Sequence, residues 1–248
     1  MPGTRHLIPV ALAVAILLPG CSAGTGDGGP GPTDAIGSPT TDVSTDTTPP
    51  ATPGQSTFVA EVWADNWFSL YVNGTKVGED SVPITTERSF NSETITFTAA
   101  YPLTIAMVTK DFKEDDTGLE YIGTDRQQMG DGGFVAQITD TVTGRVVAYT
   151  DENWRGLVVH RAPLDPACEK SASPKSDCRS AVTEEPAGWT SPGFDDAAWP
   201  EATTYTEDAV GVKDGYDDVA WSPSARLIWT ASLTQDNTVL WRRTVTGG

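Results

Sequence analysis

The sequence predicts an all-β fold, an antiparallel β-sandwich or jelly roll. After Ser56, about ten short segments alternate apolar and polar residues with the period of two that half-buried strands show. No segment carries a convincing apolar stripe of period 3.6, which an amphipathic helix would have. The 248 residues also include 24 Gly and 18 Pro, a composition rich in turn formers. Together these observations favour antiparallel strands over an α/β arrangement.

The predicted strands follow one another in short steps, with turn residues between them. Asn73-Gly74 predicts a type I′ hairpin into 75–77, because both central residues of that turn have φ > 0. Residues 140–144 separate two alternating runs and predict a second hairpin. The predicted strands are 58–63, 67–72, 75–77, 93–98, 102–109, 133–140, 145–150, 155–160, 225–231 and 238–245.

Residues 1–20 have the features of an export signal. Arg5 precedes an apolar run at 7–18, which is too short to span a bilayer core of about 30 Å. Residues 18–21, Leu-Pro-Gly-Cys, resemble the bacterial lipobox, which implies that Cys21 is diacylated and begins the mature protein. An ordinary secretory signal with a cysteine there by chance is the alternative. We therefore expect a lipid-anchored protein on the extracytoplasmic face of the cell membrane or outer envelope.

Residues 21–56 are predicted to be a disordered tether, and 57–248 the folded domain. The segment 22–56 is mainly Gly, Ser, Thr, Pro and Asp, and it offers too few apolar residues for a core. The chain has a formal charge of −18, and removing Arg5 and the four acids of the tether leaves −15 for the domain. Such a surface disfavours nucleic acid and suits cations or neutral ligands; the alternative is that the charge only maintains solubility.

The two cysteines of the domain, Cys168 and Cys178, are predicted to form a disulfide. If Cys21 carries lipid, the remaining thiols are even in number, and an exported protein often meets an oxidising environment. Closing so short a loop is worth about 3 kcal/mol in the chain-entropy model. A zinc site is the alternative, but no His lies near these thiols.

Several segments, in order along the chain, resemble galactose-binding-like jelly rolls, which occur as accessory modules of bacterial glycoside hydrolases and in surface proteins. The resembling segments are ADNWFSLYVNGTKVG (64–78), TDENW (150–154), WTSPGFDDAAW (189–199), ARLIW (225–229) and VLWRR (239–243). The resemblance runs from about residue 58 to 245 and implies a sandwich whose Trp residues pack between sheets. It implies structural roles for these motifs and identifies no ligand residue. The sequence departs from the usual module in two long insertions, 110–132 and 161–188, and long loops are often functional.

The first insertion contains a candidate Ca²⁺ site. Calcium takes six to eight hard oxygen ligands in flexible geometry. The spacing of the acids does not match an EF-hand, and a merely solvated charge run is the alternative. The candidate metal ligands are Asp111, Glu114, Asp115 and Asp116.

Two groups of residues are candidates for binding sugar. In the first insertion, amides and a carboxylate could bind hydroxyl groups while a tyrosine ring stacks on the sugar. In a second acidic cluster at 213–221, an aromatic pair lies beside carboxylates; the alternative is that Trp221 belongs to the core and the aspartates cap a turn. We expect both loops and the disulfide loop to meet at one rim of the sandwich. The candidate ligand residues are Tyr121, Gln127, Gln128, Asp131, Asp214, Tyr216, Asp217 and Trp221.

The sequence thus leads to the hypothesis of a non-catalytic surface lipoprotein that binds carbohydrate through loops of a β-sandwich. Ca²⁺ is the one candidate cofactor, and membrane contact is expected through the lipid anchor only. A protein–protein or envelope-assembly module of the same fold is the first alternative, with a surface protein as partner. A glycoside hydrolase is the second, because that chemistry needs only two acids at a set distance. Two His and no Gly-x-Ser-x-Gly motif argue against a serine hydrolase.

Overall fold

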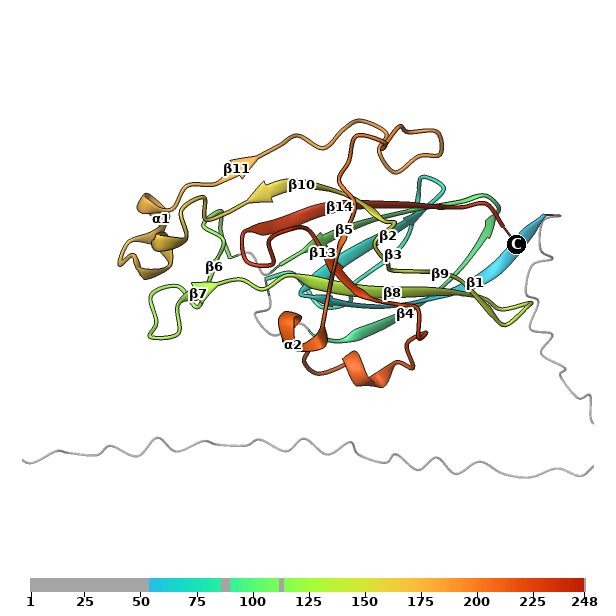
Figure 1. The fold of residues 1–248 in the computed structure, drawn as a ribbon, viewed down its shortest axis with the longest axis horizontal. Helices are drawn as coiled ribbons and strands as arrows, with labels where there is room; N and C mark the ends of the chain where they lie inside the picture. Colours follow the sequence, from blue (N-terminus) through green and yellow to red (C-terminus); the bar gives the residue numbers. More distant parts are fainter. Residues whose placement is uncertain (1–53, 86–89, 112–113, 248) are drawn as a thin grey trace, which may run out of the picture. The chain divides into compact units, whose positions relative to one another are not determined.

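Two antiparallel six-stranded sheets pack as a β-sandwich (Figure 1). The computed structural model describes residues 54–85, 90–111 and 114–247. All of them belong to one compact unit, with 44% strand and 9% helix. The predicted fold class is therefore confirmed.

The first sheet, sheet A, has the strand order β12-β13-β8-β1-β4, and β9 pairs with β8. The second, sheet B, has the order β11-β10-β14-β5-β2-β3, and β6 pairs with β7 in a separate small ladder. Sheet A consists of β1 (Gln55–Asp65), β4 (Ser92–Ala100), β8 (Gly133–Asp140), β9 (Arg145–Tyr149), β12 (Thr203–Tyr205) and β13 (Leu227–Trp229). Sheet B consists of β2 (Trp67–Val72), β3 (Thr75–Glu79), β5 (Leu103–Lys110), β10 (Arg155–Arg161), β11 (Ala181–Val182) and β14 (Asp236–Val245). The remaining elements are β6 (Leu119–Glu120), β7 (Gln128–Met129), η1 (Pro166–Lys170), α1 (Pro174–Asp177), α2 (Glu207–Val210) and η2 (Tyr216–Asp218).

Both predicted hairpins are present. Asn73 and Gly74 have φ of 51° and 84°, the positive pair that a type I′ turn requires, and they join β2 to β3. In the second hairpin, Asp140 Oδ1 accepts hydrogen bonds from the backbone N–H groups of the next turn residues, Val142 and Thr143. Gly144 completes this turn with a φ of 68°. Local turn chemistry thus sets the register of both hairpins.

Large aromatic side chains fill the space between the sheets. The ring of Phe134 lies 6.0, 6.4 and 5.4 Å from the rings of Trp154, Trp229 and Trp241, measured between centroids. All four side chains are buried. Each indole N–H has an acceptor, as for Trp241, whose Nε1 donates to Thr109 Oγ1 at 2.9 Å. The core therefore buries large apolar area without leaving a ring donor unsatisfied.

The outer face of each sheet is covered as well. Strand residues adjacent to core positions point to the opposite face, because the side-chain period of a strand is two. On sheet B, Trp189 and Trp199 pack against Ala106 and Leu240. On sheet A, the segment around α2 and η2 packs against Trp63. The covering is partial, since alternate residues of β4, at the edge of sheet A, stay exposed.

The disulfide Cys168–Cys178 is present, with Cα atoms 5.5 Å apart, and it joins η1 to the residue after α1. The loop that it closes contacts the first insertion. Gln127 Nε2 donates to the carbonyl oxygens of Glu169 and Ser171 at 2.8 and 2.9 Å. The expected meeting of these two loops is thus found (Figure 1).

The predicted signal at 1–20, the lipidated Cys21 and most of the tether lie outside the described residues. At the predicted start of the domain, β1 begins slightly earlier, since Gln55 and Ser56 already pair with β4. Within the described part of the chain, no helix combines the length and apolar character needed to cross a bilayer.

Candidate ligand and cation site

Four acidic side chains meet at one end of the sandwich. Asp65 is the last residue of β1, Asp111 follows β5 directly, Glu120 ends β6, and Asp131 lies two residues before β8. The backbone brings these positions together because β1 and β8 are paired neighbours, with Asp65 opposite Gly133. We call these four residues, Asp65, Asp111, Glu120 and Asp131, the carboxylate cluster.

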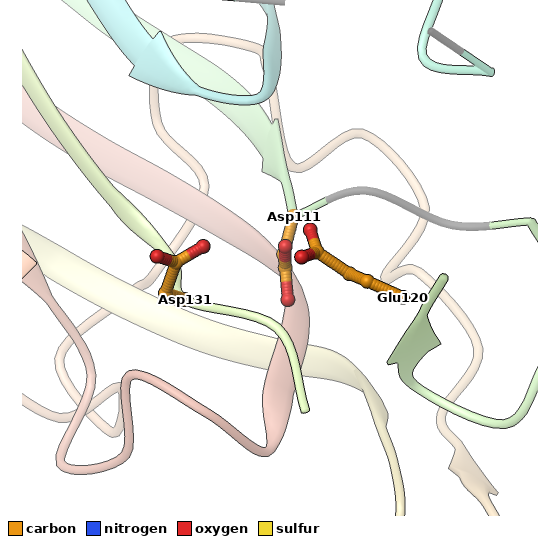
Figure 2. A group of neighbouring side chains, drawn as sticks. All are labelled: Asp111, Glu120 and Asp131. Atoms are coloured by element: carbon orange, nitrogen blue, oxygen red, sulfur yellow. The ribbon is translucent and has the colours of Figure 1, made fainter. Parts of the chain in front are cut away.

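Three members of the cluster direct their oxygens toward one point. One carboxylate oxygen from each of Asp111, Glu120 and Asp131 lies within 4.8 Å of the other two. Figure 2 shows the carboxylates of Asp111 and Glu120 facing each other, with Asp131 approaching from the other side. The side chain of Asp111 is fully buried, Glu120 is buried, and Asp131 is 33% exposed. We call these three residues the acidic triad.

The surroundings of the triad hold its carboxylates in place. Asn237 Nδ2 donates to Asp111 Oδ2 at 3.2 Å, and Gln128 Nε2 donates to Glu120 Oε2 at 3.0 Å. The backbone at Gly130 passes so close that a Cβ there would overlap the Asp111 carboxylate. Glycine at this position therefore provides the space that Asp111 occupies.

Among the described residues, Lys213 is bonded to two members of the cluster. Its Nζ lies 3.0 Å from Asp65 Oδ2 and 3.2 Å from Asp131 Oδ2, and 4.3 Å from the centre of the Phe90 ring. Lys213 belongs to the second acidic segment of the sequence, so that segment does reach the first insertion. The ammonium group thereby neutralises one side of the cluster.

Burial dominates the electrostatics of these carboxylates. Desolvation raises the pKa of Asp65, Asp111 and Asp131 above the usual aspartate value. For Asp111, the negative charges of Glu120, Asp65 and Asp131 raise the pKa further. Burial on its own would lower the pKa of Lys213, but its two aspartate partners raise it.

Several buried oxygens in this region have no hydrogen-bond donor among the described residues. They are Asp65 Oδ1, Asp111 Oδ1, Asp131 Oδ1 and Asn237 Oδ1. A buried acceptor without a partner costs roughly 1–3 kcal/mol, and more when it is charged. Such a group in a native protein calls for an explanation, and a bound ion or ordered water is a usual one.

A pocket of about 520 Å³ adjoins the cluster. Glu120 and Asp131 contribute to its wall, so the triad faces it from one side. The guanidinium of Arg126 lies 4.3 Å from the centre of the Tyr121 ring and covers part of it. We call it the rim pocket; its lining residues are Phe90, Glu120, Tyr121, Arg126, Gln128, Asp131 and Lys213.

Three of the predicted sugar-binding residues, Tyr121, Gln128 and Asp131, line the rim pocket. Gln127 does not. Its amide is used within the protein, since Nε2 donates to the disulfide loop and Oε1 accepts from the Gly123 N–H at 2.9 Å. Gln127 therefore fixes the shape of the insertion.

The predicted metal ligands separate in space. Asp111 joins the triad, whereas Glu114 is exposed and belongs to no described group of acids that could hold a metal. Asp115 Oδ1 accepts from the Thr117 N–H at 2.9 Å, and its other oxygen lies 3.5 Å from Lys175 Nζ. Asp116 lies 3.6 Å from the Nε2 atom of His160. The carboxylates that approach Asp111 instead come from residues 120 and 131.

The predicted residues of the second segment, unlike Lys213, do not line the rim pocket. Tyr216 packs its ring edge against Trp63, with centroids 5.7 Å apart, and the Trp221 N–H donates to the Tyr216 carbonyl at 3.0 Å. The Asp214 carbonyl accepts from the Trp63 indole, while Asp217 is exposed. Tyr216 lines a separate pocket of about 460 Å³, next to α2. These rings therefore serve mainly to cover sheet A.

Sequence reasoning missed Asp65, Glu120, Lys213 and Phe90 as members of the site. In the sequence, Asp65 belongs to a motif for which the resemblance implies a structural role, and Glu120 is one acid among many in the insertion. The sequence does carry one signal: Asp65 and Asp111 each lie two residues after a predicted strand, 58–63 and 102–109, where polar side chains of neighbouring strands gather.

A scan against protein-family models found no matching family, and searches of curated proteins and of solved structures found no match.

Proposed function

We propose that the protein is a non-catalytic lipoprotein, anchored to the membrane and facing outward, that binds carbohydrate in the rim pocket. The observation that carries this proposal is the composition of that pocket. Its wall combines two aromatic rings, a guanidinium group, an ammonium group, a primary amide and two carboxylates in a space of about 520 Å³. Sugars offer an apolar ring face and many hydroxyl groups, which this mixture can contact by stacking and by hydrogen bonds.

The charge of the domain supports a neutral ligand over a phosphorylated one. The chain carries a formal charge of −18, and four of its acids form the cluster beside the pocket. An anionic ligand would be repelled by this field, since Lys213 is already paired with Asp65 and Asp131. The resemblance of the strand motifs to galactose-binding-like jelly rolls agrees with a carbohydrate ligand.

Binding of the full chain to a broad glycan array tests the proposal. We expect retention of a restricted set of neutral glycans, and at least tenfold weaker retention for Gln128→Ala and for Arg126→Ala. Gln55→Ala, which removes an exposed amide at the start of β1, is the control and should bind as the wild type does. Thermal unfolding of each variant confirms that it is folded.

Two results would contradict the proposal. If folded wild-type protein retains no glycan, a protein partner becomes the better explanation for an exported module of this fold, and crosslinking on intact cells should then identify it. If the protein instead cleaves the glycans that it meets, with loss of turnover on replacing one cluster carboxylate, the protein is a hydrolase.

A further inference from the structure

We infer that Asp111, Glu120 and Asp131 form a calcium site beside the rim pocket. The inference stands on the geometry of the triad and on buried oxygens that lack donors. It differs in position from a site built on the consecutive acids at 114–116.

The spacing of the oxygens suits calcium. Ca²⁺ binds oxygens at 2.3–2.6 Å, so two ligands on opposite sides of the ion lie about 4.6–5.2 Å apart. The three carboxylate oxygens of the triad lie within 4.8 Å of one another, which allows all three to bind one ion. Every candidate ligand atom in the triad is a hard oxygen, the ligand type that Ca²⁺ prefers over nitrogen or sulfur.

A second observation, independent of the number of acids, points to a bound ligand. Asp111 is fully buried, yet its Oδ1 has no hydrogen-bond donor among the described residues. Asn237, whose amide N–H group binds the other oxygen of Asp111, is also buried and has a carbonyl oxygen without a donor. A buried oxygen without a hydrogen-bond donor destabilises the folded protein unless a bound ion or water contacts it.

The excess of negative over positive charge around the triad also favours a bound cation. Lys213 bridges Asp65 and Asp131, and this one ammonium group serves two carboxylates. No ion pair of Asp111 is found among the described residues, and the negative charges of Glu120, Asp65 and Asp131 act on it. A buried carboxylate among like charges is costly unless a cation compensates for it, and a divalent ion would do so for two acids at once.

The position beside the pocket suggests how the ion would be used. Glu120 and Asp131 belong both to the triad and to the pocket wall, so the open side of the ion would face the pocket. Three protein oxygens leave coordination positions for water or for ligand hydroxyl groups, because Ca²⁺ takes six to eight. This last step rests on the proposed function, whereas binding of the ion itself does not.

Calorimetric titration of Ca²⁺ into the full, EDTA-treated protein tests the site, with Tb³⁺ luminescence as a second readout. We expect binding of one Ca²⁺ per chain and an increase in the melting temperature. Asp111→Asn and Glu120→Gln preserve side-chain size and should weaken Ca²⁺ binding at least tenfold. The matched controls Glu114→Gln and Asp116→Asn remove acids of the same insertion and should change the affinity less than twofold.

The variants also separate loss of the site from loss of the fold. Because Asp111→Asn removes a buried negative charge, it should be at least as stable as the wild type in EDTA and should gain no stability from Ca²⁺. Absence of Ca²⁺ and Tb³⁺ binding by folded wild-type protein would overturn the inference. So would equal weakening by Glu114→Gln, or binding that survives both triad variants. Ca²⁺ binding without any glycan binding would contradict only the proposed function.

Discussion

At the scale of single residues, the candidate site depends on pairs whose shapes fit each other. Asp111 can be buried at the end of β5 because position 130 has no side chain. Asn237 then holds one oxygen of that carboxylate through a hydrogen bond of 3.2 Å. Neither contact could be predicted from the sequence, because residues 111, 130 and 237 meet only through the pairing of distant strands.

Gly130→Ala should therefore destabilise the protein by about 1–3 kcal/mol, because the new methyl group would displace a buried carboxylate in a closely packed region. Urea unfolding measures this change. The comparison variant is Gly123→Ala, where no atom lies within 4 Å of the added Cβ and the φ of 78° is the source of strain. That variant should lose about 1 kcal/mol, from the conformational restriction alone. If both variants retained wild-type stability, the close approach at Gly130 would be refuted.

Asp80 gives a prediction for the effect of pH. Burial raises its pKa to about 6, even though its Oδ1 accepts a hydrogen bond from the Val82 N–H at 2.8 Å. The folded protein thus binds a proton at Asp80 more tightly than the unfolded chain does, because the pKa of an aspartate in an unfolded chain is about 3.9. The contribution of Asp80 to the free energy of unfolding should accordingly fall as the pH rises from about 4 to 6.

Asp80→Asn should reduce this slope, measured by urea unfolding in EDTA across that pH range. Asp125→Asn, which removes an exposed carboxylate, serves as the control. An unchanged slope in Asp80→Asn would show that Asp80 titrates alike in the folded and unfolded chain.

At the scale of secondary-structure elements, the long strands were predictable and the small ones were not. The predicted strands 67–72 and 133–140 have the bounds of β2 and β8, because both runs are rich in aromatic and β-branched residues and are bounded by turn residues. The two-residue strands β6 and β7 are too short to show any alternation. Glu120 lies on β6 and Gln128 on β7, so the sequence did not indicate which acids of the insertion converge.

The disulfide supports a prediction at this scale. Its loop holds the first insertion through the two hydrogen bonds of Gln127, so removing the link should loosen both segments. We expect the double variant Cys168→Ser/Cys178→Ser to be less stable than the wild type by about 2–4 kcal/mol in thermal unfolding. A reducing agent should lower the melting temperature of the wild type and leave that of the double variant unchanged. Equal melting temperatures for the two proteins would show that the link adds no stability.

At the scale of the whole molecule, the candidate site lies at one end of the sandwich. Segments around the tryptophan-rich 189–199 and around α2 cover parts of the outer faces of the two sheets. The rim pocket remains at one end, where the first insertion meets Lys213. A tether of residues 21–56, as the sequence predicts it, would let this end reach ligands away from the membrane.

Membrane attachment through Cys21 can be tested in the producing bacterium by detergent phase partitioning. The full chain should enter the detergent phase, because two acyl chains give stable anchoring. Cys21→Ser should enter the aqueous phase or remain unprocessed at the signal. Domain variants such as Gln55→Ala should partition as the wild type does. Detergent-phase partitioning of a processed Cys21→Ser protein would contradict lipid attachment at this residue.

The most direct test of the site is a crystal structure of the protein grown with Ca²⁺, using the anomalous signal of the ion. Our account predicts a peak at calcium–oxygen distance from Asp111, Glu120 and Asp131, with its open side toward the rim pocket. A peak at Glu114–Asp116, or an acidic triad that holds only water at saturating Ca²⁺, would contradict it.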